Sequence, residues 1–150
     1  NISRVMSLRD GTKKMSKSED SDYSRINIKD NSDEIIKKIK KAKTDSLPIS
    51  EDIKEMEKRP EALNLINIFS DLKNKDLKKT LTDFSGKDFS YFKKELSEVI
   101  IDIICPIGKE MTKMNNDRKY LQEILKKGSE KASIKAEENL KKIREIVGFV

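Results

Sequence analysis

From residue 31 onward, the apolar residues of this sequence recur at the three- and four-residue intervals that place side chains on one face of an α-helix. This spacing matters because charged residues make up 40% of the chain and hydrophobic residues only 35%, a composition that can otherwise indicate disorder. Only 5 glycines and 3 prolines are present to interrupt helices. The sequence therefore predicts a mainly α fold, a helical bundle that follows a short strand and a polar loop.

The expected helix boundaries follow from capping residues, prolines and glycines. Ser32 is the expected N-cap of the first helix, because the acids Asp33 and Glu34 then occupy its first turn, where the helix dipole favours them. Pro106 and Gly108 should kink or interrupt the longest helix. The other expected elements are a strand at 5–8, a second extended stretch at 25–29, a linker at 44–59, helices at 60–72, 76–82 and 89–107, and a final helix pair around 121–125 and 132–147.

Several classes of chemistry are excluded by residue types that are missing or rare. The chain has no histidine, which excludes histidine-based acid–base catalysis and most zinc sites. Its single cysteine, Cys105, excludes internal disulfides and cysteine metal clusters, and its apolar surroundings indicate a structural thiol. The longest apolar run, 99–107, is too short to cross a bilayer. We therefore predict neither a protein-bound metal nor a membrane partner.

A polar loop from Arg9 to Asp22 concentrates positive charge near the start of the chain. Within the first 18 residues, five cations face a single acid, Asp10; the cations are Arg4, Arg9, Lys13, Lys14 and Lys17. Such a loop would repel itself unless it binds an anion. Lys14 and Lys17 are three residues apart, so both ammonium groups can reach one triphosphate, and the hydroxyls of Ser16 and Ser18 add neutral donors.

A rival phosphate motif overlaps this loop and fails on two counts. Residues 11–18 nearly match the P-loop pattern G-x-x-x-x-G-K-S/T. Ser16, however, replaces the second glycine, whose role is to let the backbone wrap the phosphates. The acids of 19–22 then follow where a helix should begin, so we reject the P-loop.

Five lysines lie on one face of the first expected helix, within 37–43. Such a run is usually a solvated surface, and the alternative is a stripe that contacts nucleic-acid phosphates. The net charge of +6 is compatible with either interpretation. Lys37, Lys40 and Lys41 are our candidates for such contacts.

Taken together, these motifs resemble a known family. The order Arg4-Val5-Met6-Ser7-Leu8 followed by Lys14-Met15-Ser16-Lys17-Ser18 resembles the second signature, KMSKS, of the class I aminoacyl-tRNA synthetases. Further segments resemble the bacterial and organellar tryptophanyl enzymes and extend over essentially the whole chain: 36–46, 60–65, 92–93, 105–107 and 128–132.

The resemblance implies a function for each part of the loop. Tryptophan and ATP, with its Mg²⁺, would give tryptophanyl-adenylate, and the acyl group would then pass to tRNA(Trp). Lys14 and Lys17 are the catalytic candidates, because they would hold the leaving pyrophosphate. The backbone at Val5 would touch adenine, residues Met15 to Ser18 would close over ATP, and Lys37, Lys40 and Lys41 would contact tRNA. The family also implies a homodimer when full-length, in the bacterial cytoplasm or in an organelle.

The resemblance also implies that this sequence is a C-terminal fragment. Residues 1–30 would end a Rossmann-type, nucleotide-binding catalytic domain, and residues 31–150 would form the helical C-terminal region. The family's histidine-bearing signature is absent, and most of the tryptophan site should lie outside the chain, so the piece alone should not make adenylate. The alternatives are a non-catalytic basic helical module that binds nucleic acid and a helical protein-interaction domain.

Overall fold

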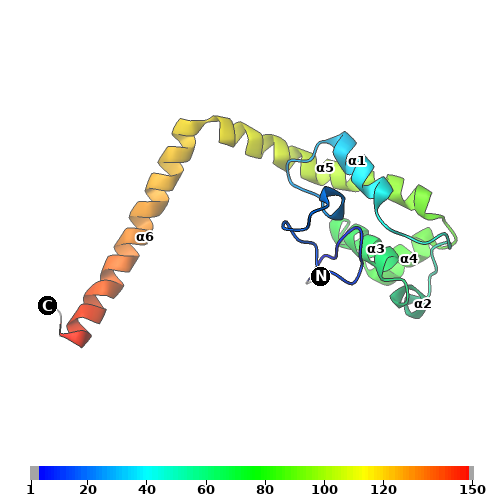
Figure 1. The fold of residues 1–150 in the computed structure, drawn as a ribbon, viewed down its shortest axis with the longest axis horizontal. Helices are drawn as coiled ribbons and strands as arrows, with labels where there is room; N and C mark the ends of the chain where they lie inside the picture. Colours follow the sequence, from blue (N-terminus) through cyan, green and yellow to red (C-terminus); the bar gives the residue numbers. More distant parts are fainter. Residues whose placement is uncertain (1–3, 149–150) are drawn as a thin grey trace. The chain divides into compact units, whose positions relative to one another are not determined.

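The computed structural model describes residues 4–148, and its contacts divide the chain into two units, Asn1–Lys109 and Glu110–Val150. The described part has six α-helices, one short 3-10 helix and no strand, which confirms the predicted mainly α class (Figure 1). The elements are η1 (Asp22–Ser24), α1 (Ser32–Lys41), α2 (Ile53–Glu57), α3 (Pro60–Leu72), α4 (Leu77–Phe84), α5 (Phe89–Asn116) and α6 (Arg118–Val147). No helix among the described residues is long and apolar enough to cross a membrane.

The first helix, α1, begins with a capping box one residue earlier than predicted. The side chain of Asn31, not Ser32, is the N-cap, and its Oδ1 accepts from the Glu34 amide at 3.0 Å. Glu34 Oε2 accepts in return from the Asn31 amide at 2.8 Å. The sequence pattern misplaced the cap because asparagine and serine are equally good N-caps, and only the reciprocal bond to Glu34 selects between them.

The predicted linker at 44–59 contains a helix that the sequence pattern did not indicate. Asp52 caps α2 by accepting from the Lys54 amide at 2.9 Å, and Met56 of this helix is fully buried. Helix α3 begins at Pro60, as predicted. The amide of the first helical residue has no partner within the helix, so proline, which lacks an amide hydrogen, costs no hydrogen bond there. Helix α4 ends at Phe84, directly before the predicted Ser85–Gly86 stop.

Helix α5 continues through Pro106 to Asn116, so an interruption at Pro106 is wrong, and the alternative, a kink, stays a prediction. A proline inside a helix costs about 3 kcal/mol. Pro106 lies on an exposed side of the helix, whereas Phe92, Leu96 and Ile100 are buried in the first unit. Packing of that buried face is what offsets the lost hydrogen bond.

Aromatic side chains from three helices meet at the centre of the first unit. The rings of Phe69 and Phe84 lie edge to face with centroids 5.1 Å apart, and those of Phe84 and Phe92 do so at 4.9 Å. Phe89 is also buried. All four phenylalanines belong to the hydrophobic core. Cys105 is half-buried against this core, with its Sγ 3.7 Å from Ser32 Oγ.

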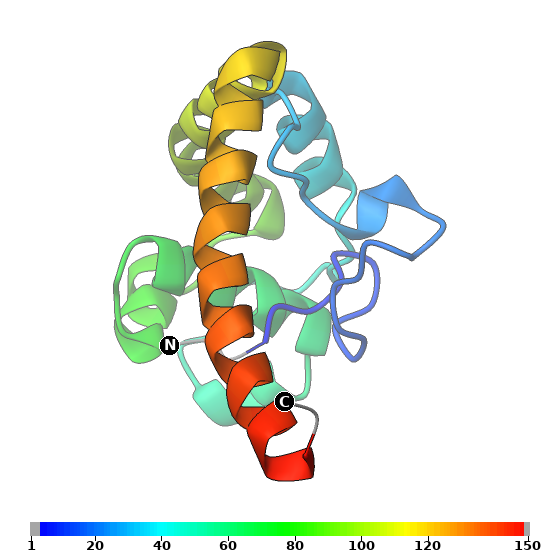
Figure 2. The same ribbon diagram turned by 90° about the vertical axis from the view of Figure 1, so that its left-hand side faces the viewer.

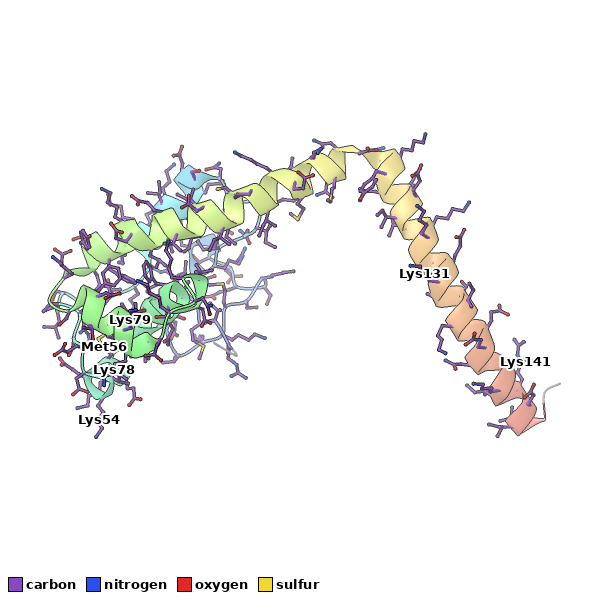
Figure 3. The ribbon with its side chains drawn as sticks, turned by 180° about the vertical axis from the view of Figure 1, so that it is seen from behind. Lys54, Met56, Lys78, Lys79, Lys131 and Lys141 are labelled. Atoms are coloured by element: carbon purple, nitrogen blue, oxygen red, sulfur yellow. The ribbon has the colours of Figure 1, made fainter. Side chains whose placement is uncertain are left out.

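In the second unit, α6 is one helix of 30 residues where a pair was predicted. Asp117 caps it by accepting from the Tyr120 amide at 2.9 Å, and Gly128 is accommodated inside the helix. None of its described side chains is buried, and Figure 3 shows them projecting outward, with Lys131 and Lys141 labelled. Its apolar stripe, which includes Leu125 and Ile143, is therefore exposed within this chain.

Candidate functional site

The lysine-rich loop is closed at its base by a pair of backbone hydrogen bonds. The Ser7 amide donates to Lys13 O at 2.8 Å, and the Met15 amide donates to Val5 O at 3.0 Å. Met6 and Lys14 therefore face each other in a single antiparallel bridge. The strand predicted at 5–8 does not form beyond this one bridge. The second stretch, at 25–29, has no strand.

The first side of the loop, residues 5–8, is fixed to the helices by a buried amide side chain. Asn64 of α3 accepts from the Met6 amide at 3.1 Å through Oδ1 and donates to Met6 O at 3.0 Å through Nδ2. Leu8 is buried, its amide donates to Ser24 O, and its carbonyl accepts from the Lys43 amide, both at 2.8 Å. The loop and η1, drawn in blue in Figure 2, are thus joined to the helical part by main-chain bonds.

Two of the loop's cations already have partners. Asp10 accepts from the hydroxyl of Thr12 at 2.6 Å and from its amide at 3.0 Å, and these bonds lower the pKa of Asp10. The resulting carboxylate lies 3.5 Å from the Lys13 ammonium. Arg9 donates to the carbonyl of Lys41 at 3.0 Å. Lys13 is therefore paired with a carboxylate within the turn, and Arg9 has a carbonyl partner in α1.

Lys14 and Lys17, by contrast, are exposed, and in the described part of the chain their ammonium groups form neither an ion pair nor a hydrogen bond. Between and beside them, Ser16 Oγ and Ser18 Oγ lie 2.9 Å apart, and the Ser18 amide donates to Ser16 Oγ at 3.3 Å. Met15 is half-buried and packs against the core. The loop thus presents two unneutralised ammonium groups and two hydroxyls from a fixed base, an arrangement suited to phosphate oxygens.

The run of five lysines divides into exposed and paired members. Lys37, Lys40 and Lys41 are exposed, as predicted, and Lys41 lies over the ring of Tyr23, with Nζ 4.2 Å from the ring centroid. Lys43 pairs with Glu61 at 2.6 Å. Lys38 is buried, so its assignment to a solvated face is wrong; acids from the preceding segment reach over α1 and enclose it.

Lys40 also borders a groove of about 670 Å³ between α1 and α5. The groove combines apolar side chains, among them Ile36 and Phe89, with the cations Lys93 and Lys94. The Lys93 ammonium donates to the carbonyl of Ala42 at 2.7 Å, and burial lowers the pKa of this lysine. The acids Asp45 and Glu98 also line the groove, so the candidate contacts of the lysine run adjoin a surface of mixed charge.

Sequence reasoning missed the residues that hold the loop in place. Asn64 sits among the apolar positions of α3, and a polar residue at a core position is a signal that could have identified it. Asp22 and Asp30 gave no such signal, because acids in a polar loop are unremarkable until a buried cation is found beside them. Among residues 4–148 the structure contains no group of three histidine, cysteine or acidic side chains arranged to hold a metal ion.

Comparisons with known proteins match both the loop and the helices. The family model described as "tRNA synthetases class I (W and Y)" matches residues 2–104. A tryptophan–tRNA ligase of Rhizobium meliloti is 45% identical over 98% of this chain and 42% of its own length, and one of Rickettsia felis is 48% identical over 98% and 44%. The chain therefore spans less than half the length of these relatives.

A solved structure agrees on the fold. The crystal structure of tryptophanyl-tRNA synthetase from Mycoplasma pneumoniae superposes with a TM-score of 0.79, covering 98% of this chain and 44% of that one, at 24% identity. The family match extends over more than two thirds of this chain and includes the whole lysine-rich loop. The chain accordingly belongs to the class I tRNA synthetases of the W and Y family.

Proposed function

We propose that this chain is the C-terminal part of an ATP-dependent tryptophan–tRNA ligase, and that its loop binds the polyphosphate of ATP. The names of the similar proteins support the choice of tryptophan over tyrosine. One observation carries the role of the loop: Lys14 and Lys17 are left without partners in the described structure, whereas the adjacent Lys13 is paired with Asp10.

In the proposed reaction, a carboxylate oxygen of tryptophan attacks the α-phosphorus of ATP, and the bond to the β-phosphate oxygen breaks. Pyrophosphate leaves with the bonding electrons, so negative charge develops on the oxygen that Lys14 and Lys17 can reach. Ammonium groups that meet this charge more closely in the transition state than in the ground state accelerate the step. The hydroxyls of Ser16 and Ser18 would bind the remaining phosphate oxygens, and Mg²⁺ would arrive with ATP.

The other parts of the chain have supporting roles in this proposal. The Val5 backbone would contact adenine. Residues Met15 to Ser18 would close over ATP, starting from Met15, which is half-buried at the base of the loop. Residues 1–30 would complete a Rossmann-type catalytic domain, and residues 31–150 would form the helical region whose exposed lysines, Lys37, Lys40 and Lys41, contact tRNA(Trp). We place the full-length protein as a homodimer in the bacterial cytoplasm, or in an organelle if it is nuclear-encoded.

The test uses the full-length protein and tryptophan-dependent exchange of pyrophosphate into ATP. Lys14→Ala and Lys17→Ala should each lower exchange by about 10- to 100-fold, because a charge-assisted hydrogen bond contributes about 1.5–3 kcal/mol. Tryptophan affinity should stay unchanged in both variants. Lys13→Ala is the matched control, since its ammonium already has a carboxylate partner.

Exchange that survives both substitutions would contradict the role of the loop. Absence of exchange in the unmodified full-length protein would contradict the proposed activity itself.

A further inference from the structure

One buried cation, Lys38, has no part in the chemistry proposed for the loop. Its side chain is 5% exposed and lies beside Ile35 and Ile39 on the buried face of α1. Its ammonium is 2.6 Å from Asp22 Oδ2 and 2.7 Å from Asp30 Oδ2. Burial disfavours the charged form, but the hydrogen bonds to Asp22 and Asp30 outweigh it and raise the pKa of Lys38. Lys38 is therefore held as a cation between two carboxylates.

Both carboxylates belong to the segment that follows the lysine-rich loop. Asp22 begins η1, four residues after Ser18, and Asp30 lies directly before the cap of α1. Asp30 Oδ2 also accepts from the Asn27 amide at 2.8 Å. Lys38 thus ties both ends of the stretch from 22 to 30 to one point on α1.

Arg25 extends this connection to the end of the loop. One of its guanidinium nitrogens, Nη2, lies 3.1 Å from Asp22 Oδ1, and Nη1 donates to the carbonyl of Glu19 at 2.9 Å. Glu19 immediately follows Ser18. On the other side of the loop, Leu8 is bonded to Ser24 of η1. The two acids, Lys38 and Arg25 therefore form a clamp, the stem clamp, which fixes the chain immediately after the loop.

A clamp of this kind restricts where the loop can travel. Lys17 is in a short stretch, 16–18, whose only hydrogen bonds in the described structure are local. Met15 and Glu19 anchor the two ends of this stretch. Catalysis by positioned charges is sensitive to small displacements, and a shift of about 1 Å can change rates by about 100-fold.

We propose that Lys38 is a positioning residue for the phosphate-binding loop: through Asp22 and Arg25 it fixes the downstream end of the loop, so that Lys17 reaches the leaving pyrophosphate. This inference rests on the proposed function for its catalytic consequence. Its structural part, the restraint on the loop, can be measured without activity.

The experiment compares variants of the full-length protein. Lys38→Met removes the charge but keeps the length of the side chain, and Lys54→Met makes the same change at an exposed lysine of α2. Asp22→Asn weakens the clamp at a side chain that is 55% exposed, which keeps the test valid if Lys38→Met fails to fold. Lys38→Arg restores the charge. The readouts are kcat and KM in pyrophosphate exchange, and the rate of trypsin cleavage after Lys13, Lys14 and Lys17.

We expect Lys38→Met to lower kcat/KM for ATP by about tenfold, with the KM for tryptophan unchanged. Asp22→Asn should lower kcat/KM for ATP by a smaller factor. Lys38→Arg should recover part of the kcat/KM that Lys38→Met loses. Cleavage within the loop should be faster in both clamp variants than in Lys54→Met.

Three outcomes distinguish failure of the positioning role of Lys38 from failure of the proposed function. If the ATP parameters and the cleavage rates of both clamp variants match those of Lys54→Met, the inference is overturned. It is also overturned if kcat/KM for ATP and kcat/KM for tryptophan both decrease in proportion to the folded fraction. Lys38 would then be needed only for folding. If the unmodified protein shows no exchange, the proposed function fails, whereas faster cleavage in the clamp variants would still support the restraint.

Discussion

At the scale of single residues, Gly11 shows how an absent side chain allows the loop to approach α3. A Cβ built on Gly11 would lie 2.4 Å from the carbonyl carbon of Pro60 and 2.5 Å from the Glu61 amide nitrogen. Atoms in folded proteins do not approach so closely, and both neighbours are backbone atoms of a helix, which cannot turn aside as a side chain would. The loop can keep this position only with glycine.

Gly11→Ala should therefore destabilise the protein by about 1–3 kcal/mol, in the range of overpacked cores. Gly128→Ala is the control: nothing lies within 4 Å of its added Cβ, and it is inside a helix. There alanine should raise stability by up to about 1 kcal/mol, since glycine is a poor helix former. Thermal denaturation of both variants checks the opposite signs. An unchanged midpoint for Gly11→Ala would show that the contact is absent.

The residue scale also shows what the sequence could and could not reveal. Lys14 and Lys17 were identified correctly as a pair on a loop, because their spacing and their neighbours are local properties. Lys38 has the same side chain in an equally local pattern, yet it is buried. Its environment depends on Asp22 and Asp30, and no periodicity in α1 indicates that a separate segment folds over it.

At the scale of elements, Arg59 organises the segment between α1 and α3. Its guanidinium donates to both carboxylate oxygens of Asp45, at 2.8 and 2.6 Å. It also donates to the carbonyls of Pro48 and Leu47, at 2.9 and 3.0 Å. This segment was expected to be an irregular linker, and a single side chain directly before α3 binds one of its carboxylates and two of its backbone carbonyls.

The Asp45–Arg59 pair makes part of the stability dependent on pH. The hydrogen bond from Arg59 lowers the pKa of Asp45 in the folded protein. The stabilisation is therefore complete above the unfolded-state pKa, about 4, and is lost as pH falls through the lower folded value. Asp45→Asn should be less stable than the unmodified chain at neutral pH, and the difference should shrink below about pH 4. Denaturation of both proteins at several pH values measures this difference in stability. A difference that stays constant with pH would contradict a stabilising ion pair between Asp45 and Arg59.

Helices with strong local signals were predicted well, and the errors have physical causes. The apolar periodicity of α3, α4 and α5 is continuous, so their existence followed from the sequence. The passage of α5 through Pro106 did not, because it depends on packing along the opposite face. The five residues of α2 are too few to show a period: Met56 is its one buried residue, and Ile53 is half-buried against the core.

At the scale of the whole molecule, the distribution of positive charge separates solvated lysines from candidate tRNA contacts. Lys37, Lys40 and Lys41 lie on α1, and Lys40 borders the groove to which α5 contributes Lys93 and Lys94. Lys54, Lys78 and Lys79, which Figure 3 labels, are exposed lysines of α2 and α4. Equal numbers of charges can therefore be removed from two distinct surfaces.

If α1 contacts tRNA, changing Lys37, Lys40 and Lys41 to Gln in the full-length protein should flatten the salt dependence of tRNA binding. The slope of log K against log salt should change by up to about 0.7–0.9 per lost phosphate contact. The matched control changes Lys54, Lys78 and Lys79 to Gln, with the same loss of net charge. Equal slopes for the two triple variants would leave the α1 lysines as a solvated surface.

The family was identifiable from the sequence because the loop motif and its flanking segments are contiguous. The division of the chain after Lys109, however, was not foreseen, since α5 runs across it without a break in helical pattern. The predicted boundary at residue 30 concerns the full-length catalytic domain and stays a prediction.

The closed base of the loop has a consequence for the energetics of substrate capture. The backbone of Lys14 is already fixed opposite Met6, so a nucleotide that bridged Lys14 and Lys17, as proposed, would need to immobilise little more than residues 16–18. Ordering the backbone of one residue costs about 1–2 kcal/mol of conformational entropy. In the proposed function, the short free tip would therefore lower the entropic cost of binding the nucleotide, because most of the loop's backbone entropy has already been lost during folding.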